Sequence, residues 1–401
     1  MHPREIFGEL LVNTQATIVR GTCNRTMEAV GDSVLVVVEL SPDRYDAIVA
    51  ASAVICADGG RTGHMESLCR SRGIPVLRVD RAELDGIVGK VTVRLDRQSV
   101  TLGEAKSPRQ APTSVTAHPG DLGSICVVIA AAADVEATNA LTPRIEQVTS
   151  FFVREEFVCL AAGLSPLDAL RAGPRAAERY GAAIGSEVCA IAKELLPGQR
   201  LVLRLLDLRS DDAARITTAE VGQETNPDLG LHGARWLLKD QHYPSAFRAL
   251  RAYVRERLGP DAERVGFAVP FINDHHEFRR LRQHLDLPDD VPLAVFVETP
   301  AAVHSAADFC AAGAAELFVG TKDLVQFYLA ADRANHLVAT SYQTRHPAVL
   351  AGIGQVVTAA RRAATPVHVF ALAADLDHFA RNLPATGFMM CTAEVRLLAP
   401  R

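Results

Sequence analysis

Three features are missing from this 401-residue sequence: closely spaced cysteines, long apolar segments and an excess of positive charge. The eight cysteines include no CxxC pair, which argues against a disulfide framework or a zinc site and fits a reducing cytosol. No segment reaches the roughly 18 apolar residues of a membrane span, and residues 1–10 lack the pattern of an export signal. A net charge of -5 provides no positive field for nucleic acid. We therefore expect a cytoplasmic protein that binds neither nucleic acid nor a membrane.

What is present is enough apolar sequence, 48% of all residues, for two domains. Residues 33–39 and 52–57 are short apolar runs typical of β-strands, and 91–102 alternates apolar and polar residues as a half-buried hairpin does. These runs predict a small α/β domain over residues 1–104. Residues 105–123 contain prolines and little apolar periodicity, which predicts a linker.

A regular pattern follows this linker. Apolar runs alternate with stretches that are in most cases helical, and their number and spacing predict a (β/α)8 barrel, or TIM barrel, over residues 124–401. In such a barrel the reactive groups lie at the carboxyl ends of the strands. The eight runs are 125–132, 148–153, 200–206, 265–271, 293–298, 316–320, 366–372 and 387–391.

Charged residues directly follow several of these runs. Arg154, Arg204, Glu298 and Asp323 would all point into one barrel mouth. Two carboxylates and two guanidinium groups suit a divalent cation together with a phosphate or carboxylate group. For any one of these residues, ion pairing at the barrel rim is the commoner explanation, but four at equivalent strand ends favour a binding site.

Several motifs follow one another in a single order along the chain. They are GGRTGH (59–64), VTSFFVREEF (148–157), LRLLD (203–207), NPDLGLHGAR (226–235), FVETPAAV (296–303) and GTKDLVQFYLAADR (320–333). Over residues 30–395 this set resembles the phosphoenolpyruvate-utilising enzymes, a family that includes enzyme I of the sugar phosphotransferase system, phosphoenolpyruvate synthase and pyruvate phosphate dikinase. The first motif resembles the phosphohistidine signature of the family's swivelling domain, and the others resemble motifs of its barrel.

The resemblance implies that His64 carries a phosphoryl group taken from phosphoenolpyruvate and moves with its domain between two sites. A near-neutral imidazole is a competent nucleophile, and the glycines allow backbone N–H groups to approach a phosphate. Arg61 and Thr62 add donors for substrate binding. Considered alone, a histidine after a glycine turn is more often a helix cap or a surface residue; the ordered set of motifs favours the carrier.

For the barrel, the resemblance implies a Mg2+ cofactor held by Glu298 and Asp323. Metal and cationic groups are the main requirement of phosphoryl transfer, because they offset the charge on the transferring oxygens. The matching positions make Arg154 and Arg204 catalytic and place four further side chains at the substrate, namely His232, Arg235, Lys322 and Arg333.

The sequence also departs from the family's pattern. The seventh barrel strand of the family ends in Cys-Gly-Glu, whose cysteine protonates the enolate, whereas residues 369–371 here are VFA. His232 stands in place of a phosphate-binding arginine and Lys322 in place of an asparagine, and LRSDD at 208–212 replaces a glycine-rich loop. These departures leave open whether phosphoenolpyruvate is the substrate.

Two replacements for the missing proton donor are open. Cys391, at the end of the last predicted strand, would be a thiol at the barrel mouth, although a small buried hydrophobe is the commoner role. Alternatively, His368 or His232 would act through water.

Three functions agree with these residues. The first is a Mg2+-dependent phosphotransferase that moves a phosphoryl group between phosphoenolpyruvate, or a related small molecule, and an acceptor through phospho-His64. The second is a Mg2+-enolate, lyase-type enzyme without phosphohistidine, and the third is a catalytically diverged, phosphoenolpyruvate-binding regulator. The presence of His64 together with Glu298 and Asp323 favours the first.

Expectations about partners follow from the same comparison. The chain has no room for the family's ATP-grasp domain or its carrier-docking helical insert. We therefore expect that this chain by itself does not use ATP. The donor or acceptor would be a phosphorylated small molecule or a separate protein. Because barrels of this family are commonly dimers, the resemblance implies a homodimer.

Overall fold

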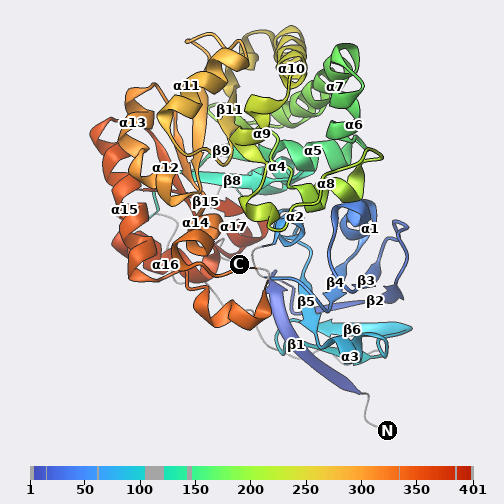
Figure 1. The fold of residues 1–401 in the computed structure, drawn as a ribbon. Coiled ribbons are helices and arrows are strands. Elements are labelled where there is room, and N and C mark those ends of the chain that lie inside the picture. Colours follow the sequence, from blue (N-terminus) through green and yellow to red (C-terminus); the bar gives the residue numbers. More distant parts are fainter. Residues whose placement is uncertain are drawn as a thin grey trace. The chain divides into compact units, whose positions relative to one another are not determined.

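The computed structural model describes residues 4–14, 16–60, 63–103, 122–141, 147–333, 335–383 and 386–398. The chain divides into two compact units, which we describe separately (Figure 1). The amino-terminal unit comprises Met1–Thr116, Ala331–Ser341 and Cys391–Arg401, and the barrel unit comprises Ala117–Ala330 and Tyr342–Met390. No helix within the described ranges has the length and apolar character needed to cross a membrane.

In the amino-terminal unit, the seven strands that the structure describes form a closed barrel in the order β1-β5-β4-β3-β2-β6-β7. They are β1 (Glu5–Val12), β2 (Ile18–Asn24), β3 (Ser33–Val37), β4 (Ala53–Cys56), β5 (Val76–Val79), β6 (Lys90–Arg94) and β7 (Ser99–Leu102). The predicted strands at 33–39 and 52–57 and the hairpin at 91–102 are confirmed. Val36, Ile55, Leu77 and Val93 belong to the buried core of this barrel.

The helices of this unit are α1 (Tyr45–Ala50), α2 (His64–Arg72), α3 (Arg81–Leu84) and α17 (Thr392–Leu398). α2 ends at Gly73, whose φ of 72° is the left-handed conformation common after a helix. Arg70 anchors α2, since its NH2 donates to the Leu11 carbonyl at 2.6 Å and its Nε lies 3.2 Å from Oε1 of Glu394 in α17. The helix that begins with His64 is therefore held firmly within its own unit.

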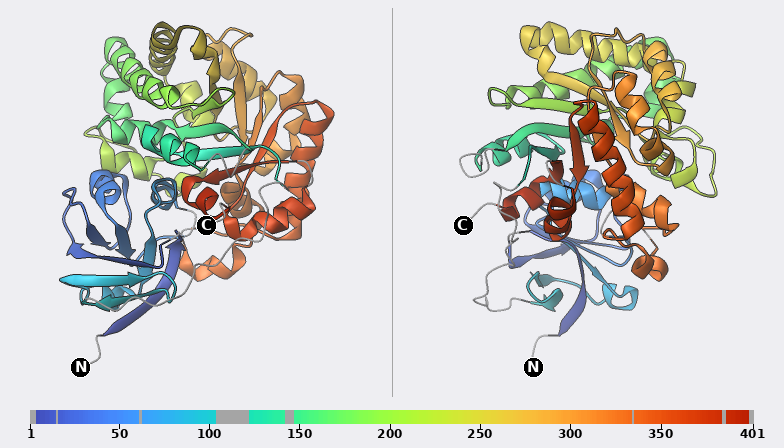
Figure 2. Two further views of the ribbon diagram at one scale, coloured as in Figure 1. Left: turned by 180° about the vertical axis from the view of Figure 1, so that it is seen from behind. Right: turned by 90° about the vertical axis from the view of Figure 1, so that its left-hand side faces the viewer.

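In the barrel unit, the described strands close into an eight-stranded parallel barrel in the order β10-β11-β12-β13-β14-β15-β8-β9, which confirms the predicted TIM barrel (Figure 2). The strands are β8 (Ile125–Ile129), β9 (Val148–Arg154), β10 (Arg200–Arg204), β11 (Val265–Val269), β12 (Leu293–Val297), β13 (Leu317–Val319), β14 (Val367–Phe370) and β15 (Gly387–Cys391). Most predicted runs extend a few residues beyond these strands, because apolar residues of the following loops, such as Leu206 and Phe271, are also buried.

Helices follow the strands around the barrel (Figure 1). They are α4 (Ala132–Asn139), α5 (Glu155–Ala161), α6 (Pro166–Arg171), α7 (Pro174–Lys193), α8 (Ser210–Ile216), α9 (Gly233–Lys239), α10 (Tyr243–Leu258), α11 (His275–His284), α12 (Pro300–His304), α13 (Ala306–Ala311), α14 (Thr321–Leu329), α15 (Pro347–Arg362) and α16 (Ala373–Asn382). Short 3-10 helices span Pro227–Leu229 and Gly259–Arg264 in this unit. Two others, Pro42–Arg44 and His336–Ser341, belong to the amino-terminal unit. α7 and α10 pack so closely that a Cβ on Gly181 would lie 1.9 Å from the Ala246 carbonyl oxygen.

Aromatic rings fill the interior of the parallel barrel. The Phe152 ring centroid lies 5.3 Å from that of Phe296 and 5.2 Å from that of Phe318. The guanidinium carbon of Arg204 lies 5.8 Å from the centroid of Phe296. This apolar layer therefore forms the floor under the charged residues at the ends of the strands.

Candidate functional site

The predicted mouth residues of the barrel lie at the carboxyl ends of neighbouring strands. Arg154 and Arg204 are the last residues of β9 and β10, Glu298 follows β12 directly, and Asp323 lies in the first turn of α14 after β13. Strand pairing brings Arg154 and Arg204 to the same level of the sheet. The carboxyl ends of the strands share one face of a parallel barrel, so these four residues occupy one region of the unit.

Arg204 is the centre of a buried network of carboxylates. It contacts Glu156, and its NH1 lies 3.1 Å from Oδ2 of Asp207 and 3.7 Å from Oε1 of Glu298. Burial alone would lower the pKa of Arg204, but Glu156, Asp207 and Glu298 together raise it above the usual arginine value. Arg204 therefore stays charged, and its position is set by three acids before any substrate binds.

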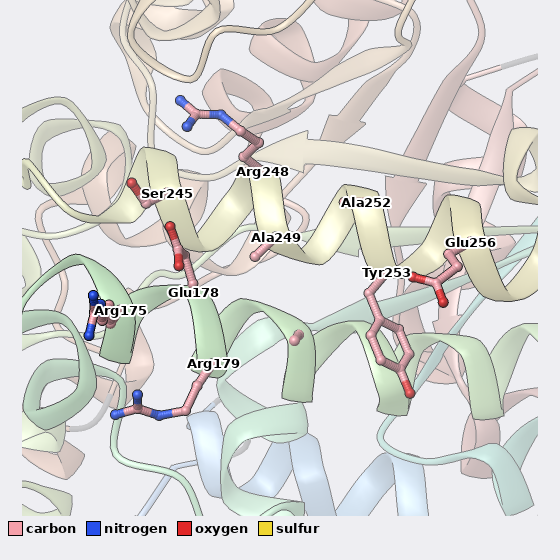
Figure 3. A pocket seen from close by; sticks show the side chains of 10 residues that line it. Arg175, Glu178, Arg179, Ser245, Arg248, Ala249, Ala252, Tyr253 and Glu256 are labelled. Atoms are coloured by element: carbon pink, nitrogen blue, oxygen red, sulfur yellow. The ribbon is translucent and has the colours of Figure 1, made fainter.

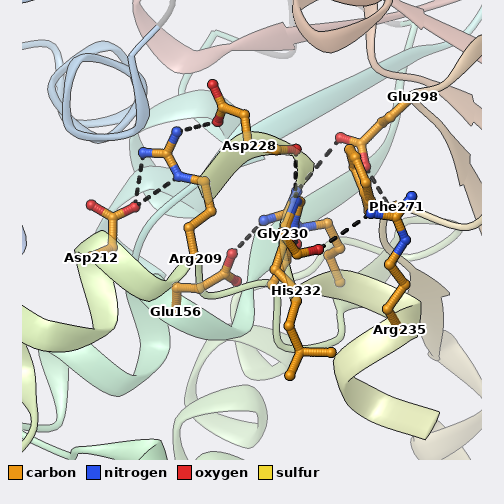
Figure 4. Close-up of polar contacts among 12 residues, drawn as sticks. Glu156, Arg209, Asp212, Asp228, Gly230, His232, Arg235, Phe271 and Glu298 are labelled. Atoms are coloured by element: carbon orange, nitrogen blue, oxygen red, sulfur yellow. Dashed lines mark hydrogen bonds and ion pairs between the residues drawn. The ribbon is translucent and has the colours of Figure 1, made fainter. Parts of the chain in front are cut away.

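Glu298 is almost completely buried, with 2% of its surface exposed. Its Oε2 accepts a hydrogen bond from the Phe271 N–H at 3.0 Å (Figure 4). Burial, and then the charge of Asp323, raise the pKa of Glu298 to about 8 against the lowering effect of Arg204. A Cβ on Gly320 would lie 2.6 Å from Cγ of Glu298, so the glycine leaves the room that this side chain needs.

These properties fit a magnesium ion. Mg2+ is commonly bound through one or two carboxylates together with substrate phosphates, rather than by a complete protein cage. Glu298 and Asp323 supply two such carboxylates whose mutual repulsion a cation would relieve. Within the described ranges, no group of three or more His, Cys, Asp or Glu side chains is arranged to hold a metal. The donor set thus suits an ion that shares its ligands with a substrate.

His232 contributes a positive charge to the same region. Its Nδ1 lies 2.7 Å from Oδ1 of Asp207, and its Nε2 lies 3.1 Å from the carbonyl oxygen of Asp228. Burial opposes protonation, but Asp207 and the Asp228 carbonyl raise the pKa of His232 above its ordinary value. Because both ring nitrogens face acceptors, the imidazolium form is favoured and compensates in charge for the arginine expected here.

Arg235 holds the backbone of the segment before His232. Its NH1 donates to the carbonyl oxygens of Leu229 at 3.0 Å and Gly230 at 3.2 Å (Figure 4). Its guanidinium carbon lies 5.2 Å from the centroid of the Phe271 ring. These contacts fix the loop that carries His232.

Lys322 and Arg154 both lie against aromatic rings. The Lys322 ammonium is 4.7 Å from the ring centroid of Phe370, and the Arg154 guanidinium carbon is 5.3 Å from that of Phe157. Both side chains are largely buried. Phe370 stands within the sequence VFA that replaces the family's Cys-Gly-Glu, so this departure provides the ring that supports Lys322.

His64 lies in the amino-terminal unit as the first residue of α2, with Gly63 as the N-cap. Its side chain is half-buried, and Nε2 lies 3.5 Å from NH2 of Arg333, a residue of the same unit. Arg61 and Thr62, predicted to bind substrate, lie outside the described residues. The Arg333 guanidinium therefore lies beside Nε2 of His64.

Comparison with known proteins gives two family matches. Residues 30–99 match the mobile domain of PEP-utilising enzymes, and residues 125–376 match their PEP-binding domain. The second match alone covers more than half of the chain.

The chain belongs to the PEP-utilising enzyme family. It is 28% identical to a probable phosphoenolpyruvate synthase of Archaeoglobus fulgidus, over 88% of this chain and 47% of the relative. It is 30% identical to a multiphosphoryl transfer protein of Xanthomonas campestris, over 76% and 37%, and 28% identical to a phosphoenolpyruvate-protein phosphotransferase of Geobacillus stearothermophilus, over 85% and 62%. The chain thus spans about half the length of the relatives that it matches.

The other two candidate proton donors are His368 and Cys391. His368 is the second residue of β14, and it bonds toward the amino ends of the strands, to Ser124 before β8 and Glu316 before β13. Cys391 is only 1% exposed. The geometry does not support the alternative that His368 acts at the mouth, because its position in the strand directs it to the other end of the barrel.

Two residues in the barrel mouth were not predicted as site residues. Asp207 joins Arg204 to His232, and Glu156 contacts Arg204. Each lies in a quoted motif, LRLLD or VREEF, and each is a carboxylate close after a strand. That position was the available signal.

A separate groove of about 670 Å3 lies between α7 and α10 on the outside of the barrel. Arg175, Arg179 and Arg248 line it together with alanines and Tyr253 (Figure 3). Its lining includes none of the predicted site residues that the structure describes. It is therefore distinct from the mouth.

Proposed function

We propose that this protein is a Mg2+-dependent phosphotransferase that moves a phosphoryl group between phosphoenolpyruvate, or a related phosphorylated small molecule, and an acceptor through phospho-His64. One observation carries the proposal: the barrel mouth holds a buried cluster of Arg204, Asp207, His232 and Glu298. Such a preset arrangement of charge suits phosphoryl transfer, which depends on positioning and electrostatic stabilisation more than on covalent chemistry. The match to the family's mobile domain includes His64.

In the transfer step, a ring nitrogen of His64 donates its electron pair to phosphorus, and the bond from phosphorus to the enol oxygen breaks. The enolate leaves and takes a proton at carbon to become the keto acid. Arg204 and the imidazolium of His232 provide positive charge for the carboxylate and phosphate groups. Reversal of the same step would use a phosphoryl group on His64 to form the phosphoenol.

Glu298 and Asp323 would hold the magnesium ion. When bound, the ion supplies positive charge beside the transferring phosphoryl group and the enolate oxygen. Glu298 would have to be ionised for this role, and the charge of Arg204 beside it favours that form. Gly320 keeps the space in which the carboxylate stands.

His232 is the proton source that we assign for the enolate, acting through water. Among the three candidates, it is the one that contacts Asp207 in the mouth network, and its neighbours raise its pKa. Val369, at the position of the family's cysteine, has no proton to give.

The experiment is incubation of the whole chain with 32P-labelled phosphoenolpyruvate and Mg2+, followed by a search for acid-labile label on the protein. We expect label on the wild type, none on His64→Ala and strongly reduced labelling of Asp323→Ala. His276→Ala, an exposed histidine on α11, is the matched control and should label normally. Label that persists in His64→Ala, or no label with either Mg2+ or Mn2+, would overturn the proposal.

A regulator that binds phosphoenolpyruvate without turning it over is the second candidate. The observation in its favour is that VFA replaces the proton-donating sequence, while the cationic mouth is retained. Calorimetric binding with no keto acid in the NMR spectrum would support it. Activity of His64→Ala together with loss of activity in Asp323→Ala would instead indicate the lyase-type enzyme. The acceptor, either a small molecule or a separate protein, and the expected homodimer belong to the same proposal.

A further inference from the structure

Gly59, Gly60 and Gly63, which precede His64, lie around the carboxylate of Glu66. Glu66 is the third residue of α2 and is only 5% exposed. Its Oε1 accepts a hydrogen bond from the Gly60 N–H at 3.2 Å. A glutamate at this helical position commonly reaches back to backbone N–H groups before the helix, and its charge is favourable near the positive end of the helix.

Two glycines of the motif make room for this carboxylate. A Cβ on Gly59 would lie 2.5 Å from Oε1 of Glu66, and a Cβ on Gly63 would lie 1.9 Å from Oε2. Gly59 also has a φ of 137°, which other residues rarely adopt. In this chain, the small size of residues 59 and 63 is therefore required by a neighbouring side chain and not solely by the approach of a phosphate.

The start of α2 is fixed from the other side by Ser67. Its N–H donates to the Gly63 carbonyl at 3.0 Å, and its hydroxyl donates to the same oxygen at 2.8 Å. Gly63 is the residue immediately before His64. The backbone on which His64 stands is consequently held between Glu66 and Ser67.

We propose that Glu66 is a positioning residue for His64: its buried carboxylate holds Gly59, Gly60 and Gly63 at the start of α2 and so fixes the direction in which the imidazole is presented. The inference rests on the proposed phosphoryl transfer through His64. The Gly60 N–H already donates to Glu66, and NH2 of Arg333 lies 3.5 Å from Nε2 of His64. A phosphoryl group formed on Nε2 would meet that guanidinium.

The test uses phosphoramidate, which transfers its phosphoryl group to histidine with release of ammonia and requires neither phosphoenolpyruvate nor the barrel. We compare the rate of His64 labelling in Glu66→Ala, Glu66→Gln and the control Glu28→Ala, whose side chain is exposed in the same unit. Glu66→Ala should label roughly 10- to 100-fold more slowly, since small misplacements of a reacting group have effects of this size. Glu66→Gln keeps an oxygen acceptor for Gly60 and should restore most of the rate.

A second arm tests the packing of Glu66 against Gly63 without any phosphoryl chemistry. Gly63→Ala should lower the melting temperature strongly in the wild type, but much less in the Glu66→Ala background, because the group that meets the new methyl is then absent. The ring resonances of His64 in NMR spectra, assigned by their loss in His64→Ala, should shift in Glu66→Ala and return toward the wild type in Glu66→Gln.

The outcomes separate the two proposals. If neither phosphoenolpyruvate nor phosphoramidate labels the folded wild type, the phosphotransferase proposal fails, and the resonances of His64 together with the Gly63–Glu66 coupling still decide the role of Glu66. Wild-type labelling and unchanged His64 resonances in folded Glu66→Ala would overturn the positioning role. So would additive effects of the Gly63 and Glu66 substitutions, or a Glu66→Gln variant as slow as Glu66→Ala.

Discussion

Oδ1 of Asp207 lies 2.7 Å from Nδ1 of His232 in the buried mouth of the barrel. The other carboxylate oxygen of Asp207 lies 3.1 Å from NH1 of Arg204. One acid therefore orients two cations, and it raises the pKa of the histidine that stands where an arginine was expected. The positive charge of the mouth thus comes from Arg204 and His232, where the resemblance implies two arginines.

Asp207→Asn should lower the pKa of His232 toward its ordinary value, as measured by NMR titration of the histidine ring. The raised pKa means that protonated His232 stabilises the fold fully below its unfolded-state pKa, and that this contribution is lost as pH rises through the folded-state pKa. In Asp207→Asn that loss should be smaller. At neutral pH the variant should also be less stable by about 2 kcal/mol, because a hydrogen bond to a charged group is lost.

The matched control is Asp211→Asn, an exposed aspartate on the nearby helix α8. It should leave the His232 titration where it is in the wild type. A His232 titration that is the same in Asp207→Asn as in the wild type would show that Asp207 does not set the charge of the mouth.

Gly320→Ala should weaken metal binding at the mouth. The added methyl would lie 2.6 Å from Cγ of Glu298 and 2.6 Å from a ring carbon of Phe296, so the glutamate must move. We expect a roughly 10-fold or greater loss of Mn2+ affinity, read by electron paramagnetic resonance, since displaced ligands and their supports have effects of this order.

Gly354→Ala is the control for this substitution. A Cβ on Gly354 meets nothing within 4 Å, and the residue lies inside α15, so alanine should stabilise the helix by roughly 0.5–1 kcal/mol. Its Mn2+ affinity should equal that of the wild type. Equal Mn2+ affinity in Gly320→Ala would argue against Glu298 as a metal ligand.

Much of this architecture could be predicted because the parallel barrel buries its strands on both faces. Such strands are continuous apolar runs, so all eight stood out, and the charged residues that follow them, such as Arg204 and Glu298, marked the mouth. β1, β2 and β5 in the smaller unit were missed. Most side chains of β1 and β2 are only partly buried and several are polar, and β5 has only four residues. A strand of that kind has no clear apolar pattern.

The partners of the site residues could not be predicted in the same way. Asp207 meets His232 across 25 positions of sequence, and only the folded loop brings them together. A histidine inside an apolar strand can serve either end of a barrel, so His368 was open until its level in β14 was known. Motifs identified the residue types, whereas the hydrogen-bond partners depended on the tertiary structure.

Glu316→Gln should destabilise the barrel without changing the phosphoryl chemistry. Glu316 is 1% exposed and joins Arg200, at 2.6 Å, to His368, whose other ring nitrogen lies 2.9 Å from the Ser124 hydroxyl oxygen. Glutamine removes the charge of a buried carboxylate that accepts from Arg200 and contacts His368, and weakening such charged hydrogen bonds costs about 2 kcal/mol. Because the chain of contacts lies at the amino ends of the strands, labelling of His64 should be unaffected.

Thermal unfolding measures this effect, with Asp308→Asn as the control. Asp308 lies 3.9 Å from His275 and is exposed, so its replacement should change the melting temperature little. Reduced labelling of a folded Glu316→Gln protein would contradict a purely structural role for the contacts of Glu316.

Glu155→Gln should remove a pH dependence of stability that originates behind the mouth. Burial raises the pKa of Glu155 to about 7 from 4.5, although the hydroxyls of Tyr180 and Tyr243 each donate to it at 2.5 Å. The folded protein therefore binds more protons than the unfolded chain between about pH 4.5 and 7, so the free energy of unfolding falls as pH rises through this window.

The size of the effect follows from the same difference in pKa. At about 1.4 kcal/mol for each pKa unit, ionisation of buried Glu155 costs the folded wild type about 3 kcal/mol above pH 7. Glutamine resembles the protonated acid in shape and in having one donor and one acceptor side, so Glu155→Gln should match the wild type near pH 4.5 and exceed its stability at pH 8.

Urea unfolding at a series of pH values checks this, with exposed Glu178→Gln on α7 as the control. A wild-type slope that persists in Glu155→Gln would place the titrating group elsewhere. A slope reduced by the expected amount would show that Tyr180 on α7 and Tyr243 on α10 hold Glu155 as a neutral acid.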